Sequence, residues 1–398
     1  MALSLHVLAD ENIPAVQDAF EPFGSVRTMP GRSITAADLH DVDVLLVRSV
    51  TTVDAHLVAN SPVQFVGSAT TGTDHVDRDA LDEANATFAH APGANATSVA
   101  DYVVAALLHV AMRTGTPLKG RRLGIVGCGN IGQRLAQRAP ALGLEVLPND
   151  PPRADAADAA GRAHSFVSLE HVLDAADIIT LHVPLTHDGS HPTHHLIDAE
   201  ALRRMGSETW LLNTSRGAVV DNAALLRALD AGTRGPTVLD VWEDEPTPMA
   251  DLLRQVDLAT PHIAGYALDG KLRGTRMLFD ALCDHLGVDV PWPDAATLTP
   301  ASPDALVCTP PDPRLPRTEW LHALAQQAYV IGNDDARLRP YATMPADEQG
   351  PFFSRLRKTY PRRRELQVHR VSASAIPATY YDAVDDGLTL AVTSSPSR

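Results

Sequence analysis

Three side chains in the second half of the sequence are of the types that can oxidise an alcohol by hydride transfer. Arg216 precedes a glycine, Glu245 precedes a proline and His262 follows one, with intervals of 29 and 17 residues between them. A histidine can take the hydroxyl proton near neutral pH, and a carboxylate beside it would orient and stabilise the charged imidazole. An arginine can hold a substrate carboxylate through two parallel hydrogen bonds. Taken singly, each residue is better explained by a surface, turn or helix-start position, so the catalytic hypothesis needs a fold that brings the three together.

A glycine-rich turn at residues 127–132 predicts that fold. Residues 121–126 before it read as a buried strand, and residues 131–142 after it as a helix. A second strand is expected at 144–147, followed by Asp150. A strand, a glycine turn, a helix, a strand and an acid is the order of a dinucleotide-binding unit.

Each glycine of the turn has an expected task. Gly127 would allow the tight turn, Gly129 would let the backbone approach a pyrophosphate, and Gly132 would let the helix pack closely on the strand. The helix N-terminus would offer free N–H groups and the positive end of its dipole to the phosphates. Asp150 would accept hydrogen bonds from the adenosine ribose and repel a 2′-phosphate, which favours NAD over NADP. The alternative for Asp150 is a turn residue before Pro151.

Length and composition limit the classes of protein that fit. A chain of 398 residues is too long for one ordinary core, so two or three domains are expected. The net charge of −16 argues against nucleic acid as a partner, and no apolar stretch is long enough to predict a membrane span. Three cysteines and an N-terminus without a signal-peptide pattern predict a cytoplasmic location.

The spacing of apolar residues predicts parallel strands joined by helices, in a doubly wound α/β sheet. Strands are expected at 3–9, 42–47, 63–67, 178–182, 210–213 and 237–240, with a long apolar helix over 98–112. Ligands bind at the carboxyl ends of strands in such sheets, where Asp150, Asn213 and Asp240 stand.

The last quarter of the chain has a different composition. Residues 291–316 contain eight prolines, which predicts a linker. Beyond it, a helix is expected over about 320–331 and strands at 366–371 and 388–393. This part is small, and pairing with a second copy of the chain would stabilise it.

The chain resembles the D-isomer-specific 2-hydroxyacid dehydrogenase family from about residue 5 to residue 286. The resemblance rests on the glycine turn and on the segments 213–221, 239–246 and 260–262. It implies that Arg216, Glu245 and His262 are catalytic, with His262 as the acid and base.

The resemblance also implies a domain plan. A flavodoxin-like substrate domain would comprise residues 1–98 and 266–290, with a Rossmann-type NAD domain of residues 99–265 inserted in it. A linker at 291–317 would lead to a small α+β dimerisation domain at 318–398, which makes the protein a homodimer.

Further site residues follow from the resemblance by position. The implied cofactor contacts are Gly127, Gly129, Asn130, Ile131, Gly132, Asp150, Val183, Thr214, Ser215, Arg216, Asp240 and Gly265. At Val183 the family often has threonine, so only a backbone contact is expected there. The implied substrate contacts are Ser49, Thr70 and Tyr266.

Within the family, the chain is most similar to the branch that oxidises the 2-hydroxyl of 4-phospho-D-erythronate with NAD in vitamin B6 biosynthesis. This similarity rests on the segments 9–14, 48–51, 72–77, 262–266, 334–339 and 356–361. The cation for the 4-phosphate stays open. Arg48 is one candidate, and an arginine of 355–370 that reaches the partner subunit's active site is another.

Other interpretations remain at this stage. A 3-phosphoglycerate dehydrogenase would share the fold and catalytic residues, and an NAD-sensing corepressor-like protein would share the fold without turnover. Five histidines within 182–195 suggest a metal site, but their spacing fits a polar loop better, and we expect no metal. The seven basic residues from Arg355 to Arg370 fit a solvated helix and turn better than a nucleic-acid patch.

Overall fold

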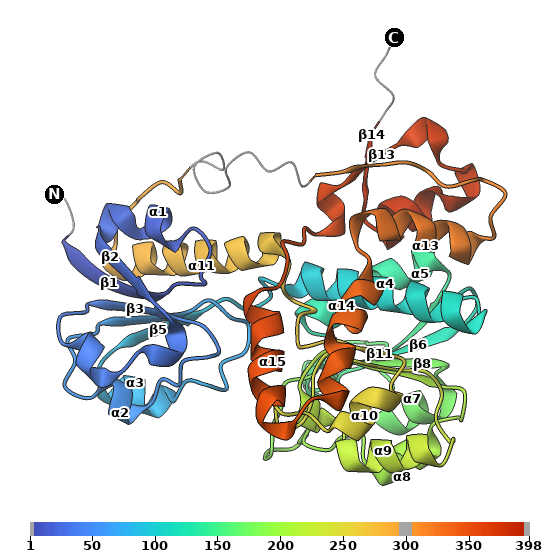
Figure 1. The fold of residues 1–398 in the computed structure, drawn as a ribbon, viewed down its shortest axis with the longest axis horizontal. Coiled ribbons are helices and arrows are strands. Elements are labelled where there is room, and N and C mark those ends of the chain that lie inside the picture. The colour runs from blue at the N-terminus through green and yellow to red at the C-terminus, as the bar shows by residue number, and fades with distance from the viewer. Residues whose placement is uncertain (1–3, 294–304, 394–398) are drawn as a thin grey trace. The chain divides into compact units, whose positions relative to one another are not determined.

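The computed structural model describes residues 4–293 and 305–393, and the chain divides into two compact units (Figure 1). Unit 1 comprises Met1–Asn95 and Ala267–Asp304, and unit 2 comprises Ala96–Tyr266 and Ala305–Arg398. Each unit is described by itself.

Unit 1 is built on a parallel sheet of five strands in the order β2-β1-β3-β4-β5. The strands are β1 (Leu5–Asp10), β2 (Gly24–Met29), β3 (Val44–Val47), β4 (Phe65–Ser68) and β5 (Thr87–His90). The helices are α1 (Val16–Phe20), α2 (Ala55–Val58), α3 (Arg78–Glu83) and α11 (Leu268–Leu286). Buried side chains of α1 and α11 pack on one face of the sheet, and those of α2 and α3 pack on the other.

Unit 2 contains a parallel sheet of six strands in the order β11-β10-β9-β8-β6-β7. The strands are β6 (Arg122–Val126), β7 (Glu145–Asn149), β8 (Ile178–Leu181), β9 (Trp210–Asn213), β10 (Thr237–Leu239) and β11 (Leu258–Ala259). The helices between and before them are α4 (Ala96–Thr114), α5 (Asn130–Leu142), α6 (Pro151–Ala159), α7 (Leu169–Ala175), α8 (Ala199–Arg204), α9 (Asn222–Asp230) and α10 (Ala250–Gln255). Strand order reverses between β6 and β8, which is the switch point where doubly wound sheets bind ligands.

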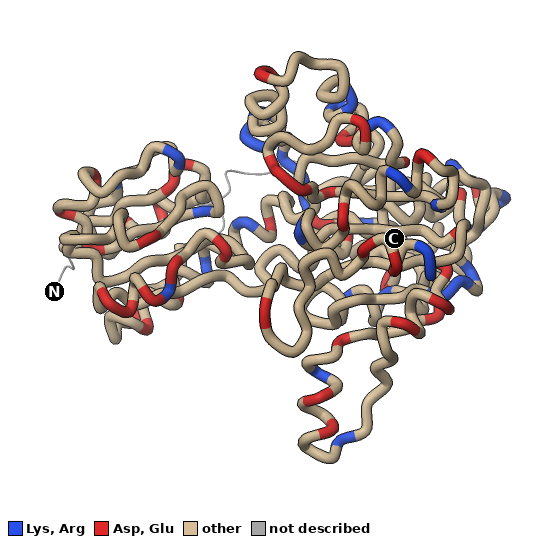
Figure 2. Tube along the Cα trace, turned by 90° about the horizontal axis from the view of Figure 1, so that it is seen from below, with Lys and Arg blue, Asp and Glu red and all other residues tan. Residues whose placement is uncertain are grey.

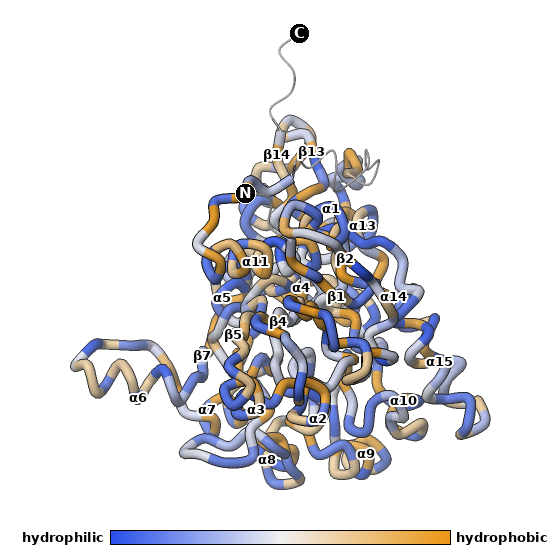
Figure 3. Tube along the Cα trace, turned by 90° about the vertical axis from the view of Figure 1, so that its left-hand side faces the viewer, coloured by the Kyte–Doolittle hydropathy of each residue, from blue (hydrophilic) through white to orange (hydrophobic). Residues whose placement is uncertain are grey.

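Both faces of this sheet are covered by helices. α4 and α5 pack on one face, and α7, α8, α9 and α10 pack on the other. α6 carries one buried residue and projects away from the rest of unit 2 (Figure 3). Figure 2 shows basic and acidic residues interspersed along both units, so the net charge is spread over the chain.

The C-terminal part of the chain packs on this same unit. It consists of β12 (Val307–Cys308), α13 (Arg317–Ala328), α14 (Ile331–Leu338), α15 (Ala346–Lys358), β13 (Arg370–Ser372) and β14 (Ala391–Thr393). The three strands form a small parallel sheet in the order β12-β13-β14. Asp101 on α4 accepts hydrogen bonds from Arg138 Nη1 and from the Leu366 backbone N–H, each at 2.8 Å. A buried carboxylate thus ties the C-terminal part to α4 and α5.

The predicted α/β class and the parallel Rossmann-type sheet are confirmed. The edge strands β2, β5 and β11 went unpredicted, because they are half-exposed or only two residues long. The strand expected at 366–371 is wrong in its first half, where a 3₁₀ turn spans Leu366–Val368. β12 lies inside the segment expected to be a linker, and residues 294–304 of that segment are outside the described residues.

Candidate active site

The glycine turn joins β6 to α5 and has the geometry of a phosphate cradle. Gly127 has φ of 91°, a conformation that side-chain-bearing residues rarely adopt. A Cβ on Gly132 would lie 2.1 Å from the Gly127 carbonyl oxygen, whereas a Cβ on Gly129 would meet nothing within 4 Å. The space over Gly129 is therefore open beside the N-terminus of α5, which fits the pyrophosphate of a dinucleotide.

Asp150 follows β7 and is 9% exposed. One carboxylate oxygen accepts a hydrogen bond from the Cys128 N–H of the glycine turn at 2.9 Å, and the other caps α6 through the Arg153 N–H at 3.2 Å. Asp150 is thus the N-cap of the helix that Pro151 begins, so it has the local role of the alternative interpretation as well as a bond to the glycine turn. Asp150 is fixed beside the turn, where its carboxylate can accept from a ribose.

Beyond β8, a neutral histidine braces one of the predicted cofactor contacts. His182 lies with Nε2 2.9 Å from Thr180 Oγ1 and Nδ1 3.2 Å from Thr214 Oγ1. Burial lowers the pKa of His182 to about 3, so the ring is uncharged at neutral pH. Val183 follows it, and its Cγ1 would lie 2.9 Å from a Cβ on Gly127, so this position brings a methyl group to the glycine turn and leaves only its backbone for hydrogen bonds.

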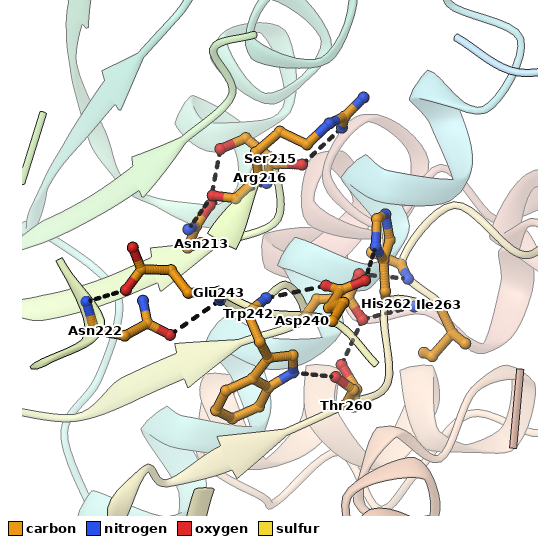
Figure 4. Close-up of polar contacts among 12 residues, drawn as sticks. Asn213, Ser215, Arg216, Asn222, Asp240, Trp242, Glu243, Thr260, His262 and Ile263 are labelled. Carbon is orange, nitrogen blue, oxygen red and sulfur yellow. Dashed lines mark hydrogen bonds and ion pairs between the residues drawn. The ribbon is translucent and has the colours of Figure 1, made fainter. Parts of the chain in front are cut away.

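The loops after β9 and β10 carry Arg216 and Glu245. The Asn213 side chain accepts from the Ser215 backbone N–H at 3.0 Å and donates to the Arg216 carbonyl at 2.8 Å, as Figure 4 shows in part. These bonds fix the turn that presents Arg216, whose Nη1 donates to the Ser215 carbonyl at 2.8 Å.

Glu245 and His262 meet in the folded chain. Glu245 Oε2 lies 2.7 Å from His262 Nδ1, and Glu245 Oε1 accepts from the Trp242 backbone N–H at 3.0 Å. Burial alone would raise the pKa of Glu245, but His262 and Arg357 outweigh it and lower that pKa below its usual value of 4.5. The carboxylate therefore stays ionised at neutral pH and orients the imidazole with Nε2 free of this pair.

The loop that carries His262 is held on one side by a buried carboxylate. Asp240, 1% exposed, accepts from the Ile263 N–H at 2.8 Å and the Ala264 N–H at 2.9 Å, as well as from Thr260 Oγ1 at 2.6 Å. Figure 4 shows Asp240 between Thr260 and Ile263. His262 itself has φ of 56°, a conformation that costs a β-substituted residue energy and that surrounding contacts must maintain.

A buried guanidinium holds the same loop on its other side. Arg363, 7% exposed, donates from Nη2 to the carbonyl oxygens of Ile263 and Ala264. Its Cζ lies 4.4 Å from the Tyr329 ring centroid. Burial opposes its charge, but Tyr360, Tyr329 and Asp334 together raise the pKa of Arg363 above its ordinary value. Both the N–H and the carbonyl groups of two successive residues are thus bound by charged side chains.

Tyr266 ends this loop and meets α15. The Arg357 guanidinium lies over the Tyr266 ring, with Cζ 5.6 Å from its centroid. The basic residues from Arg355 to Arg370 are therefore not simply a solvated helix and turn. Arg357 and Arg363 reach the His262 loop of their own chain.

The other predicted substrate contacts, Ser49 and Thr70, lie in unit 1. Ser49 is exposed after β3, and Thr70 Oγ1 lies 2.7 Å from Ser68 Oγ after β4 and donates to the Gly72 carbonyl at 2.9 Å. His75 Nε2 is 2.9 Å from the same Ser68 hydroxyl. Both predicted residues follow the carboxyl ends of parallel strands.

Sequence reasoning missed several residues of the site: His182, Thr260, Arg357 and Arg363. His182 and the two arginines stand in clusters that had been noticed, but composition gave no sign of which members turn inward. Among the described residues, no group of three or more His, Cys, Asp or Glu side chains is arranged to hold a metal ion. In the same part of the chain, none of the helices has the length and apolar character needed to cross a membrane.

Comparison with known proteins agrees with this geometry. Residues 95–264 match the family model of the D-isomer specific 2-hydroxyacid dehydrogenase, NAD binding domain. An erythronate-4-phosphate dehydrogenase of Salinibacter ruber is 59% identical over 387 residues, which cover 97% of this chain and 99% of that protein. The chain belongs to the erythronate-4-phosphate dehydrogenase family. A member from Escherichia coli is 44% identical over 369 residues, covering 91% of this chain and 92% of that protein.

Comparison with solved structures shows the same fold in other proteins. The TT0316 protein from Thermus thermophilus is 29% identical, with a TM-score of 0.61, and covers 73% of this chain and 99% of its own. A D-lactate dehydrogenase from Aquifex aeolicus, solved with NAD and lactic acid, is 24% identical with a TM-score of 0.59 over 71% of this chain and 95% of its own. At that identity the likeness concerns the fold alone.

Proposed function

We propose that the chain oxidises the 2-hydroxyl of 4-phospho-D-erythronate with NAD, which gives 3-hydroxy-2-oxo-4-phosphobutanoate and NADH in pyridoxal 5′-phosphate biosynthesis. The observation that carries the proposal is the 2.7 Å pair of Glu245 and His262 in a chain of this family. The glycine turn with its open space over Gly129 fits the pyrophosphate, and Asp150 fits the ribose.

In this mechanism the protein positions the substrate and moves one proton. NAD, when bound, accepts the hydride from C2 of the substrate. His262 takes the proton of the 2-hydroxyl on Nε2, because Nδ1 is engaged by Glu245. The charge that develops on the imidazole is stabilised by the Glu245 carboxylate. Arg216 holds the substrate carboxylate, so that C2 faces the cofactor.

The remaining contacts are assigned by position. Cofactor is bound by residues 127 and 129–132, by Asp150, by the Val183 backbone, by residues 214–216, and by Asp240 and Gly265. Substrate is bound by Ser49, Thr70 and Tyr266. Unit 1 is accordingly the substrate domain, and the part of unit 2 before Tyr266 is the NAD domain.

Two further proposals concern the state of the protein. We place it in the cytoplasm, because Cys128, Cys283 and Cys308 are all free and buried thiols. We also propose that the C-terminal part pairs with a second copy. Val307 of edge strand β12 is 78% exposed, and an exposed apolar edge strand is suited to pairing with another chain. The mass measured by sedimentation tests this, and a monomer at micromolar concentration would contradict it.

The enzymatic proposal is tested by supplying NAD with either 4-phospho-D-erythronate or 3-phospho-D-glycerate and following NADH by absorbance. We expect a clear preference for phosphoerythronate. Preference for phosphoglycerate would retain the catalytic residues and overturn the substrate. No turnover with either, even when a 2-keto acid is added to reoxidise bound cofactor, would favour a corepressor-like NAD-binding protein.

A further inference from the structure

Arg357, a cation near the His262 loop, belongs to the C-terminal part of the chain and not to the NAD domain. Arg357 stands in the last turn of α15 and lies over the ring of Tyr266, the residue assigned to the substrate. Its side chain also takes part in a hydrogen bond with that of Tyr266. The distance from Cζ to the ring centroid, 5.6 Å, is within the range of a cation–π contact.

α15 also contacts the loop that follows Glu245. A Cβ on Gly350 would lie 3.2 Å from Thr247 Cγ2 and 3.6 Å from Pro246 Cγ, so the helix touches the two residues that follow Glu245. Phe353, between these two points, is fully buried in the core that also contains Trp242. The helix is therefore anchored where it delivers Arg357.

One N–H group of the Arg357 guanidinium is unsatisfied in the described part of the chain. Its Nε is buried and has no hydrogen-bond partner there. Burial opposes the charge, yet Tyr266, Glu245 and Asp240 together raise the pKa of Arg357 above its ordinary value. A charged guanidinium with a buried, unsatisfied N–H is stabilised when an anion supplies the missing acceptor.

Glu245, whose charge acts on Arg357, is already engaged with His262 and the Trp242 N–H. We propose that Arg357 binds the phosphate group of the substrate within its own subunit, with the Tyr266 hydroxyl fixing the orientation of the guanidinium. This inference rests on the proposed function and names the cation that the substrate phosphate requires. The planar fork of arginine suits bidentate binding of phosphate oxygens.

The test compares substrates with and without the phosphate. In R357Q, kcat/KM for 4-phospho-D-erythronate should fall by about 10²-fold, since charge-assisted hydrogen bonds are lost. Turnover of unphosphorylated D-erythronate should fall by a clearly smaller factor, because that substrate has no phosphate to lose and R357Q removes only a cation that acts on Glu245 from beyond the pair of Glu245 and His262. R357K should recover part of the loss. The matched control is R355Q, an exposed neighbour on α15 that stacks on Phe352 and should behave as wild type.

A binding measurement separates this inference from the proposed function. Inorganic phosphate is titrated by calorimetry into the NAD-loaded full-length protein, and its affinity should be at least about tenfold weaker in R357Q than in wild type or R355Q. Equal phosphate affinity in all three proteins would overturn the assignment, and so would equal losses with both substrates. Failure of wild type to oxidise phosphoerythronate would reject the proposed function, while the phosphate titration would still decide whether Arg357 binds phosphate.

Discussion

The glycine turn and the His262 loop both follow carboxyl ends of strands in one sheet, but they are stabilised in different ways. The turn is fixed by its own backbone, since Gly132 passes so close to the Gly127 carbonyl that a Cβ would lie 2.1 Å from it. The His262 loop is fixed by side chains from elsewhere, with Asp240 on its N–H groups and Arg363 on its carbonyls. The conformation of the glycine turn can therefore be predicted from the local sequence. The conformation of the His262 loop cannot, because it depends on residues distant in the sequence.

The largest effect on catalysis should come from replacing His262, the proposed base, which lies in the loop held by Asp240 and Arg363. H262N should lower kcat by about 10³-fold to 10⁴-fold, because the hydroxyl proton loses its acceptor. The KM for NAD should change little, because the glycine turn is independent of this loop. Steady-state kinetics with phosphoerythronate and NAD measures both values. A kcat within tenfold of wild type would show that another group takes the proton.

Next in size is the loss of the C-terminal support of the same loop. R363M removes the donor to the Ile263 and Ala264 carbonyls, and leaving buried acceptors unsatisfied costs about 1–3 kcal/mol each. The free energy of unfolding, measured in urea, should fall by about 3 kcal/mol, and kcat should fall in the protein that remains folded. The exposed neighbour R362M serves as control and should lose less than about 0.5 kcal/mol. Equal stability of R363M and R362M would show that Arg363 does not stabilise the His262 loop through these carbonyls.

The glycine turn and the His262 loop also differ in how well the sequence predicts them. The strand, turn, helix and Asp150 of the dinucleotide unit could be located because glycines and apolar residues act on their immediate neighbours. The Glu245 and His262 pair could be proposed from residue type. Arg363 could not be singled out, since it is one of seven basic residues between 355 and 370, and only packing decides which one faces Ile263.

The predicted boundaries of one strand are wrong because contacts distant in the sequence determine where it begins. Residues 366–371 look like one strand, yet the Leu366 N–H donates to Asp101, a carboxylate on α4. This contact spans 265 residues of sequence and belongs to a 3₁₀ turn, so that strand pairing begins only at Arg370. Contacts of this kind are invisible to local periodicity, because the partner that captures the backbone group is far away in the chain.

A smaller effect is expected from neutralising the partner of His262. E245Q keeps a polar side chain but loses the charge that stabilises the imidazolium, so kcat should fall by about 10²-fold near neutral pH. The folded pKa of Glu245 is lowered from 4.5, so its contribution to stability is present above pH 4.5 and is lost as pH falls through the folded pKa. Unfolding free energies of wild type and E245Q should therefore differ at neutral pH and converge in acid. A difference that is constant down to pH 3 would exclude a role for the carboxylate charge.

The smallest effect on stability is expected at Gly129, in the glycine turn. Gly129 faces open space, so G129A should change the free energy of unfolding by less than about 1 kcal/mol while raising the KM for NAD by about tenfold, because the methyl group occupies the position of the pyrophosphate. G132A is the matched variant. Its Cβ would meet the Gly127 carbonyl, so it should destabilise the protein whether NAD is present or not. Thermal unfolding with and without NAD distinguishes them, since ligand stabilisation should shrink in G129A, whereas G132A should melt lower before any ligand is added. If both variants lost only stability, the open space over Gly129 would not be where the cofactor phosphates bind.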